Sequence, residues 1–213
     1  MKEEADLLIE GLTALDIPFS EDQVSRLSIY LAELKKWNRA YNLTGLKTDR
    51  DIIIKHFLDS LLFLKMFPSH AITAADVGSG AGFPGIPVKI FLPLLKMFLV
   101  EPVGKKAIFL RHICSRLALD GIEIVDKRIE EVERLKVDVA MTRALYSVGD
   151  FIEKMKGHIN SGGVLILSKG PKLREELKGL EMQDVSVTDY RLPFDDTVRH
   201  LVVVKSSNLQ DGT

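Results

Sequence analysis

Hydrophobic positions at helical spacing predict that the first third of the chain is built from helices. Three such stripes occur before Pro68, and that proline ends the third. Ser20 with Gln23, and Thr48 with Asp51, match the capping pattern that begins a helix. The stripes consist of Leu8, Leu12 and Leu15; of Leu27, Leu31, Leu34 and Trp37; and of Ile53, Phe57, Leu61 and Leu64. We therefore predict a helical region over residues 1–68 whose apolar stripes pack on the remainder of the chain.

From residue 71 onward, short apolar runs alternate with helical patterns. The predicted strands cover residues 71–77, 97–101, 122–125, 137–141 and 163–168, and the predicted helices 84–92, 105–119, 129–135, 148–159 and 172–180. Such alternation is typical of a mostly parallel sheet covered by helices on both faces. The segments 184–191 and 199–205 instead alternate like an antiparallel hairpin. The sequence thus predicts an α/β, Rossmann-like domain over residues 69–205, followed by a polar, flexible tail over 206–213.

A glycine-rich stretch follows the first predicted strand, and it reads Asp76-Val77-Gly78-Ser79-Gly80-Ala81-Gly82-Phe83-Pro84-Gly85. Glycines at alternate positions permit positive φ angles and remove the Cβ atoms that would keep a ligand away from the backbone. A helix beginning at Phe83 or Pro84 would direct free N–H groups at this turn. We therefore expect a ligand here, with an anionic group at the start of the helix.

The spacing of the glycines distinguishes between two kinds of ligand. In the dinucleotide fingerprint G-x-G-x-x-G, the third glycine would fall where this chain has Phe83. The stretch more closely resembles the first motif of class I S-adenosylmethionine-dependent methyltransferases, in which an acidic residue precedes G-x-G-x-G. Glu101, at the end of the next predicted strand, stands where such folds bind ribose hydroxyls. The alternative is a glycine turn at the edge of the core with a solvated glutamate beyond it.

The composition limits which partners, metals and cellular locations can be expected for this chain. The formal net charge is -1, so any nucleic-acid surface must be a local patch. A single cysteine excludes an intramolecular disulfide, and the five histidines show no metal-ligand spacing. The acidic start lacks the pattern of a signal peptide, and charges interrupt the apolar stretches. We expect a soluble, cytoplasmic monomer with no metal and no membrane contact.

Cationic residues lie at several predicted strand tips, where a doubly wound fold keeps its chemistry. These are Lys105, Arg128, Arg143 and Lys169. Each one alone is an ordinary solvated side chain, but together they can converge on one face beside the glycine turn. Such a basic rim suits an anionic substrate.

Further motifs carry a resemblance to one family. They are Asn42-Leu43-Thr44, His56-Phe57 with Asp59-Ser60, Gly82-Phe83-Pro84-Gly85-Ile86-Pro87, Lys105-Lys106 with Phe109-Leu110, Thr142-Arg143-Ala144 and Lys169-Gly170. In this order, from Tyr41 to Pro171, they resemble the RsmG (GidB) family, bacterial enzymes that methylate N7 of a guanine in 16S ribosomal RNA. The resemblance implies an N-terminal helical appendage on a methyltransferase core. The segments before Ser20 and after Lys205 match no motif.

The resemblance also implies roles for individual residues. For the cofactor S-adenosylmethionine it implies Asp76, Gly78, Gly80, Gly82, Phe83, Glu101, Ile129, Glu130 and Arg143. For the RNA substrate it implies Lys105, Arg128, Arg143 and Lys169, and of these Arg143, Lys169 and Arg128 would act at the transferring methyl group. His56 and Asp59 remain open between a functional role and a polar pair beside the cofactor.

The residues also bear on which atom is methylated. Methylation of a pyrimidine carbon needs a thiol nucleophile, and Cys114 lies in the middle of a predicted helix. Methylation of an exocyclic amine commonly uses an Asn/Asp-Pro-Pro-aromatic tip, where this chain has Thr142-Arg143-Ala144. Guanine N7 has an in-plane lone pair and no proton, so in-line displacement there requires no general base.

Two other classes of protein stay open at this point: a nucleotide-dependent oxidoreductase, and a non-catalytic cofactor-binding scaffold. Within the methyltransferase class, the sequence leaves open whether the substrate is naked RNA or RNA in an assembled particle. We expect a target guanine presented in a loop of the small ribosomal subunit, because the chain lacks the bulk charge to hold long RNA.

Overall fold

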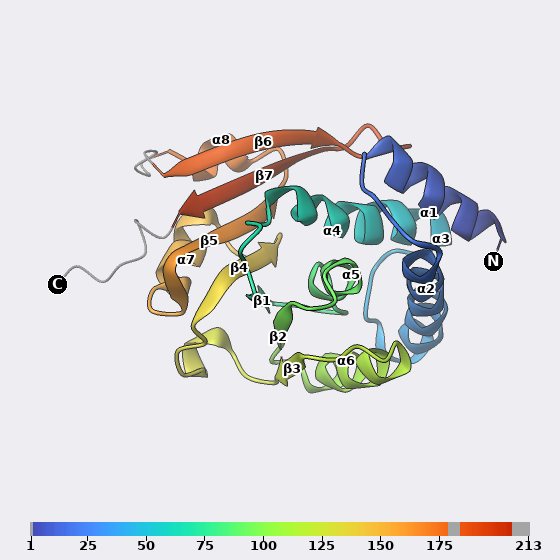
Figure 1. Ribbon diagram of the computed structural model, residues 1–213, viewed down its shortest axis with the longest axis horizontal. Helices are drawn as coiled ribbons and strands as arrows, with labels where there is room; N and C mark the ends of the chain where they lie inside the picture. The colour runs from blue at the N-terminus through green and yellow to red at the C-terminus, as the bar shows by residue number, and fades with distance from the viewer. Residues whose placement is uncertain (1, 179–183, 206–213) are drawn as a thin grey trace.

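A seven-stranded sheet runs through the computed structural model, which describes residues 2–178 and 184–205 (Figure 1). Its strands are β1 (Thr73–Val77), β2 (Lys96–Val100), β3 (Ile122–Val125), β4 (Val137–Arg143), β5 (Ile159–Lys169), β6 (Val185–Arg191) and β7 (Val198–Lys205). Their order across the sheet is β3-β2-β1-β4-β5-β7-β6. Neighbours among the first five strands are parallel, whereas β7 pairs antiparallel with both β5 and β6. The predicted Rossmann-like class with a C-terminal antiparallel hairpin is confirmed.

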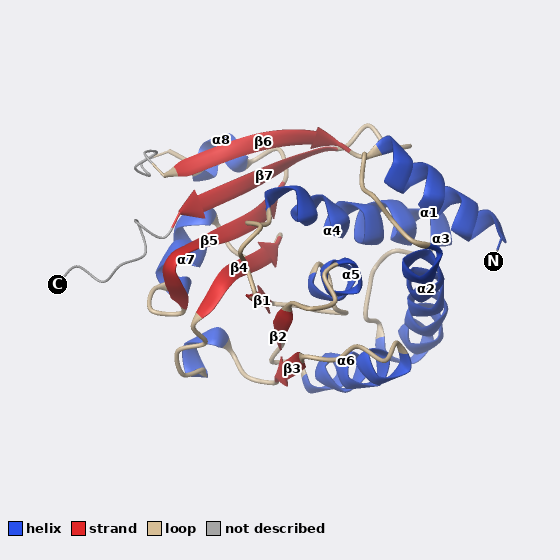
Figure 2. Ribbon diagram, viewed as in Figure 1, coloured by secondary structure: helices blue, strands red, loops and turns tan. Residues whose placement is uncertain are grey.

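Alternate residues of the central strands pack on opposite faces of the sheet. Met97 and Leu99 belong to one buried cluster together with α5 (Gly85–Phe91) and α6 (Gly104–Arg116). The intervening Phe98 belongs to a second cluster with α7 (Val148–Met155), α8 (Leu173–Glu176) and the 3-10 turn η3 (Ile129–Glu131). Figure 2 shows this arrangement of helices around the sheet. Burial of both faces explains why the strands read as continuous apolar runs.

The N-terminal helices contribute to the first of these two clusters. They are α1 (Lys2–Ala14), α2 (Glu21–Tyr41) and a continuous helical run made of α3 (Asp49–Ile52), the π-helical η1 (Ile53–Leu58), α4 (Asp59–Leu61) and the 3-10 η2 (Leu62–Met66). Ser20 and Gln23 form the predicted capping box, and Thr48 caps α3. Leu12, Leu27 and Phe57 are fully buried and belong to the same cluster as the sheet residues Met97 and Leu99. The division at residue 68 stays a prediction, and the predicted tail lies outside the described residues.

One predicted helix is wrong. The segment 129–135 forms only the turn η3, after which the chain has no regular secondary structure up to β4. Val132 and Leu135 pack against the second cluster, and the N–H of Leu135 donates to Nδ1 of His158, 3.4 Å away. Lys136 then adopts a positive φ of 54°. A helix this short is marginal by itself, so these tertiary contacts decide its conformation.

Several helices and strands in the C-terminal half of the domain begin or end at other residues than predicted. The predicted helix 148–159 ends at Met155, because β5 begins at Ile159 rather than at Gly163. The predicted helix 172–180 is described only as α8, and residues 179–183 lie outside the described part of the chain. The longer β5 pairs with β4 from Val139 to Arg143 and again at Val137 with Ile159, with a shift of register between these two parts.

Shared burial of α1 and the sheet predicts that they unfold together. Leu12 is fully buried, so Leu12→Ala should lower the free energy of unfolding by about 2–5 kcal/mol. Urea unfolding followed by far-ultraviolet circular dichroism and by Trp37 fluorescence measures this loss. The neighbouring Ile9, 39% exposed, is the matched control, and Ile9→Ala should cost much less. Two separate transitions would show that the helical region unfolds independently of the sheet.

Candidate active site

The three alternate glycines of the turn after β1 have different neighbours. All three have positive φ angles: 80° at Gly78, 60° at Gly80 and 99° at Gly82. A Cβ at Gly78 would collide with the side chain of Leu145. A Cβ at Gly82 would lie 2.6 Å from the hydroxyl of Tyr30, which donates to the carbonyl of Ala81. Only Gly80 of the three has nothing closer than 3.9 Å to its missing Cβ, so Gly80 is the position open to a ligand.

Asp76 lies beneath the turn and is fully buried. Its Oδ2 accepts the N–H of Gly85 at 2.8 Å, whereas its Oδ1 has no hydrogen-bond partner. Burial raises the pKa of Asp76 from 3.8 to about 7, although the Gly85 N–H opposes this shift. Because α5 begins at Gly85, its first N–H is already used inside the protein. The prediction of a helix starting at Phe83 or Pro84 with free N–H groups is therefore wrong. The helix starts at Gly85, and the N–H of Ile86 is also used, since it donates to the carbonyl of Gly82.

Glu101 follows β2 and reaches the open side of the glycine turn. Its carboxylate is 3% exposed and accepts two backbone N–H groups, from Gly80 at 2.8 Å and from Val103 at 2.9 Å. Lys106 lies 4.0 Å from the same carboxylate. A carboxylate has about four lone-pair sites, so two remain for further donors. The expected pairing of the glycine turn with an acidic strand tip is present in the fold.

Two cavities lie next to each other along the carboxyl ends of the strands. The first, of about 250 Å³, is lined by Leu43, Thr44, Gly45, His56, Gly78, Ser79, Gly80, Ala81, Phe83 and Arg143. The second, of about 430 Å³, is lined by Leu46, Lys55, His56, Asp59, Arg143, Ala144, Ser168, Lys169, Gly170 and Arg199. His56 and Arg143 line both cavities, so these two side chains separate the glycine turn from the second cavity.

Arg143, at the end of β4, is held by the N-terminal helical run. Its Nη1 donates to the carbonyl of Lys55 at 2.7 Å and to Oδ2 of Asp59 at 3.2 Å. Its Nη2 lies 2.8 Å from Nδ1 of His56. Its guanidinium also lies 5.5 Å from the ring centroid of Phe83. Three of the five N–H donors of a guanidinium are thus used within the protein, which leaves two for a ligand.

His56 is neutral and acts as a hydrogen-bond acceptor. Burial, followed by the nearby charge of Arg143, lowers its pKa from 6.5 to about 3. Because arginine only donates, Nδ1 accepts from it and the proton must be on Nε2, 2.7 Å from Oγ1 of Thr44. The imidazole stacks on Phe83 with ring centroids 4.4 Å apart, and Phe83 stacks in turn on Tyr30. This three-ring stack fixes the orientation of His56.

The second cavity contains two cations that the sequence analysis missed. Asp59 is 1% exposed and lies between Arg143 and Arg199, with Nε of Arg199 at 3.0 Å. Lys55 lines the same cavity. The signal for Arg199 was the register of the predicted hairpin, because β7 pairs His200 with Lys169. In the sequence, the position of Lys55 one helical turn before Asp59 could have indicated that the two side chains lie on the same face of the helix.

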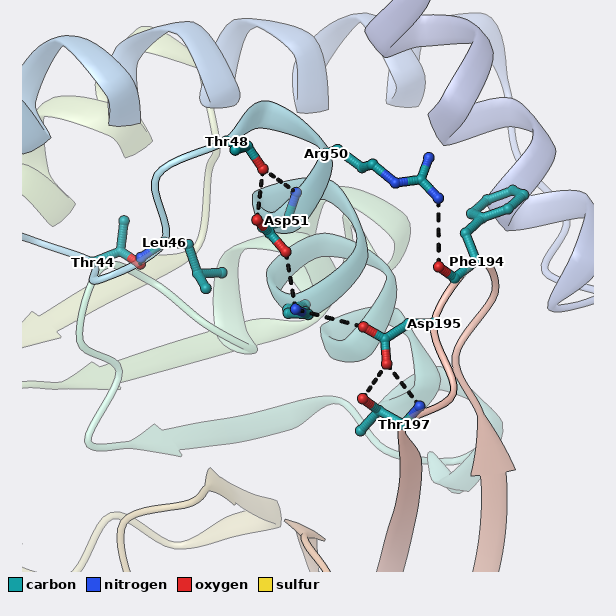
Figure 3. A network of polar contacts seen from close by, with 9 residues as sticks. Thr44, Leu46, Thr48, Arg50, Asp51, Phe194, Asp195 and Thr197 are labelled. Carbon is teal, nitrogen blue, oxygen red and sulfur yellow. Dashed lines mark hydrogen bonds and ion pairs between the residues drawn. The ribbon is translucent and has the colours of Figure 1, made fainter.

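A chain of contacts ties the tip of the β6–β7 hairpin to this region (Figure 3). Lys55 lies 2.9 Å from Asp51 and 3.5 Å from Asp195. Arg50 contacts both the carbonyl and the ring of Phe194. The hairpin therefore closes one side of the second cavity.

The other residues predicted to bind the cofactor or the substrate do not all lie at these two cavities. Lys169 is 7% exposed and contacts the carbonyl of Tyr146 at 2.6 Å and Glu176 at 2.7 Å. Lys105 and Arg128 are exposed outside both cavities. Ile129 is buried in the second cluster, and Glu130 pairs with Lys154. Their roles stay predictions.

Among residues 2–178 and 184–205 there is no group of three or more potential metal ligands. No helix in those ranges is long and apolar enough to cross a membrane.

The sheet order, the glycine turn after β1 and the carboxylate after β2 define the class of protein, a Rossmann-like methyltransferase. The fold is similar to that of a methyltransferase from Pyrococcus furiosus, with a TM-score of 0.60 and 18% identity over 85% of this chain and 98% of that one. It is also similar to M. jannaschii TYW2 in complex with AdoMet, with a TM-score of 0.51 and 16% identity over 69% and 74% of the two chains.

The chain belongs to the GidB family, whose model is described as rRNA small subunit methyltransferase G and matches residues 23–202. It is 35% identical to Ribosomal RNA small subunit methyltransferase G of Acetivibrio thermocellus, over 93% of this chain and 87% of that protein. It is also 35% identical to the Neisseria meningitidis protein of that name, over 95% and 98%. Family membership confirms the resemblance noted in the sequence and argues against the oxidoreductase and scaffold alternatives.

A prediction about His56 follows from its burial beside Arg143. Imidazole signals of His56 in long-range ¹H–¹⁵N spectra should show no titration between about pH 5 and 8, because its pKa is about 3. Arg143→Gln should raise this pKa, since it removes the second cause of the shift. A wild-type midpoint at pH 6 to 7 would contradict the neutral assignment.

The same shift affects stability. In the unfolded chain His56 takes up a proton near pH 6.5, whereas in the folded protein it does so only near pH 3. Its contribution to stability is thus present above about pH 6.5 and is lost as the pH falls through this window. The difference in unfolding free energy between wild type and His56→Gln should shift in favour of the variant as the pH falls, which urea titrations at pH 7 and 4.5 measure.

Proposed function

We propose that this protein transfers a methyl group from S-adenosylmethionine to N7 of a guanine in small-subunit (16S) ribosomal RNA. One observation carries the proposal: Arg143 and His56 separate a cavity at the glycine turn from a second cavity rich in cations. The first has the features of a cofactor site and the second those of a site for an anionic substrate. Relatives covering most of the chain are named for methylation of small-subunit ribosomal RNA.

The residues around the glycine turn fit S-adenosylmethionine. Gly80 leaves space beside the backbone, and the Glu101 carboxylate next to it keeps two acceptor sites for ribose hydroxyls. Gly78 and Phe83 line the same cavity, with Arg143 at its border. When bound, S-adenosylmethionine supplies an electrophilic methyl group. The stack of Tyr30, Phe83 and His56 keeps this wall of the cavity rigid.

The second cavity fits a nucleotide. Its lining contains the cations Lys55, Arg143, Lys169 and Arg199 and, among the residues that the structure describes, one carboxylate, Asp59, which is shared between the two arginines. Arginine and lysine bind phosphate oxygens and the O6 edge of guanine. We assign Arg143 to this contact because it still has two free N–H donors and borders both cavities.

No side chain in the site is arranged as a general base, and N7 needs none. Nδ1 of the neutral His56 accepts from Arg143, and its Nε2 faces Thr44. Asp76 is fully buried beneath the turn. The lone pair of N7 lies in the plane of the base and carries no proton. Positioning of the two reactants supplies roughly 7–11 kcal/mol in favourable cases, which is enough to dominate the rate enhancement.

The target guanine must leave its stack to enter the second cavity, which lies next to the first. Unstacking costs a few kcal/mol, which a short basic cavity offsets only if the surrounding RNA already holds the base open. We therefore propose an assembled small-subunit particle as the substrate. Protein-free 16S RNA should be methylated much more slowly.

Glu101→Gln tests the cofactor site. The amide keeps the shape of the side chain but loses the charge, so S-adenosylmethionine should bind about 10- to 100-fold more weakly, equivalent to roughly 1–3 kcal/mol. Isothermal titration calorimetry gives the affinity. Asp126→Asn, in an exposed carboxylate paired with Arg111, is the control and should leave affinity unchanged. Equal affinities for Glu101→Gln and wild type would remove Glu101 from the site.

Arg143→Ala tests the substrate contact. Methylation of purified small subunits should fall by about 100-fold or more, because Asp59 and His56 lose their partner and the base loses its contact. S-adenosylmethionine affinity should change little. Arg191→Ala, at an arginine with a 73% exposed side chain, is the matched control. Full activity of Arg143→Ala would refute the assignment, and equal rates on a short naked oligonucleotide and on the particle would refute the presented loop.

A further inference from the structure

Two segments of the chain contain cations but no acids. Between Glu33 and Asp49 there are four Lys or Arg residues and no Asp or Glu. Between Glu101 and Asp120 the same is true. In a chain whose formal net charge is -1, acid-free segments of this kind can form local basic patches. The first covers the end of α2 and the loop after it, and the second contains α6.

The fold places these two segments side by side. Helices α2 and α6 are neighbours at the lower right of Figure 1, and the contacts between them run in opposite directions along the two helices. Nη1 of Arg26 donates to the carbonyl of Leu117, and further along the ring of Trp37 lies 5.6 Å from that of Phe109. This register brings the last turn of α2 to the first turn of α6. Lys36 and Arg39 near the end of α2 and Lys105 at the start of α6 therefore share the end of the helix pair next to the carboxyl edge of the sheet.

Half of the eight cations are paired. Their ion pairs are Lys35 with Asp49, Lys106 with Glu101, Arg111 with Asp126 and Arg116 with Glu33. The other four, Lys36, Arg39, Lys47 and Lys105, are exposed and pair with no residue in the described part of the chain. Tyr41 lies among them, 44% exposed, with its ring 5.4 Å from that of Trp37. We call Lys36, Arg39, Tyr41, Lys47 and Lys105 the α2–α6 basic face.

The basic face continues into the first cavity. Asn42 ends α2 in a left-handed conformation, with φ of 49°. The loop that follows is fixed by Asn38, whose Oδ1 accepts the N–H of Thr44 at 2.8 Å. Residues 43–45 of this loop line the cavity at the glycine turn. A chain crossing Tyr41 is therefore led along this loop to His56 and Arg143.

We infer that the α2–α6 basic face binds a single-stranded segment of the RNA substrate next to the target guanine. The four free cations contact phosphates, and the ring of Tyr41 stacks on an unpaired base. Unpaired bases stack on exposed aromatic rings, and cations beside them follow the phosphate backbone. The ring of Tyr41 favours single-stranded RNA over a duplex, whose bases are stacked on each other. The choice of RNA rests on the proposed function.

Equilibrium binding without methyl transfer tests this inference. Labelled small ribosomal subunits are titrated with wild type, with Tyr41→Ala, and with Arg39→Gln combined with Lys47→Gln. Tyr41→Ala and the double variant should each raise the dissociation constant about tenfold or more, and Tyr41→Phe should bind like wild type. Lys96→Gln combined with Lys178→Gln removes the same charge elsewhere, and Phe19→Ala removes an aromatic ring that is 38% exposed. Both control proteins should bind normally.

Salt dependence identifies the partner. In the double variant the slope of log affinity against log salt should decrease by about 0.7 for each lost phosphate contact. Weaker binding with an unchanged slope would indicate a ribosomal protein instead of RNA and would overturn the inference. Unchanged binding by all variants, with normal methylation by wild type, would also overturn it. Binding losses as expected, together with no methylation by wild type, would support the basic face and refute the proposed reaction.

Discussion

The contact between Arg143 and the N-terminal helical run is the interaction on which the rest of the site depends. Arg143 ends β4, and its partners Lys55, His56 and Asp59 all come from one stretch of η1 and α4. Asp59 also binds Arg199 of β7, so one buried carboxylate connects three parts of the fold. Loss of one partner from a buried ion pair typically costs about 3–5 kcal/mol, so these elements hold each other in place. The helical region is thus part of the candidate active site and not only a cover for the sheet.

The π-helical segment η1 explains how one helix can supply these partners. In an α-helix the carbonyl of Lys55 would accept the N–H of Asp59, but that N–H instead bonds the carbonyls of His56 and Ile54. The carbonyl of Lys55 is therefore available to Arg143 at 2.7 Å. Segments of this kind occur frequently at functional sites, because they free backbone groups for other contacts. The neutral His56 next to it adds an acceptor without adding a second positive charge.

The sequence predicted the sheet, the glycine turn and Glu101, because each depends on local patterns. It predicted the positive φ angles of Gly78 and Gly82, but not that Leu145 and Tyr30, from distant elements, occupy the space of their missing Cβ atoms. Arg199 was missed for a similar reason, because it enters the site only through the pairing of β7 with β5. The helix predicted over residues 129–135 was wrong because apolar spacing cannot separate a short helix from an irregular segment packed on a core.

The net charge of this chain is close to zero, but its cations are clustered at particular places in the fold. A formal charge of -1 would suggest a protein indifferent to nucleic acid, yet the acid-free parts of α2 and α6 meet beside the first cavity. Within the second cavity the cations outnumber Asp59, which is already shared by two arginines. Salt screening limits the range of electrostatic attraction to about 8–10 Å under physiological conditions. These cations therefore attract only RNA that is already close to the site.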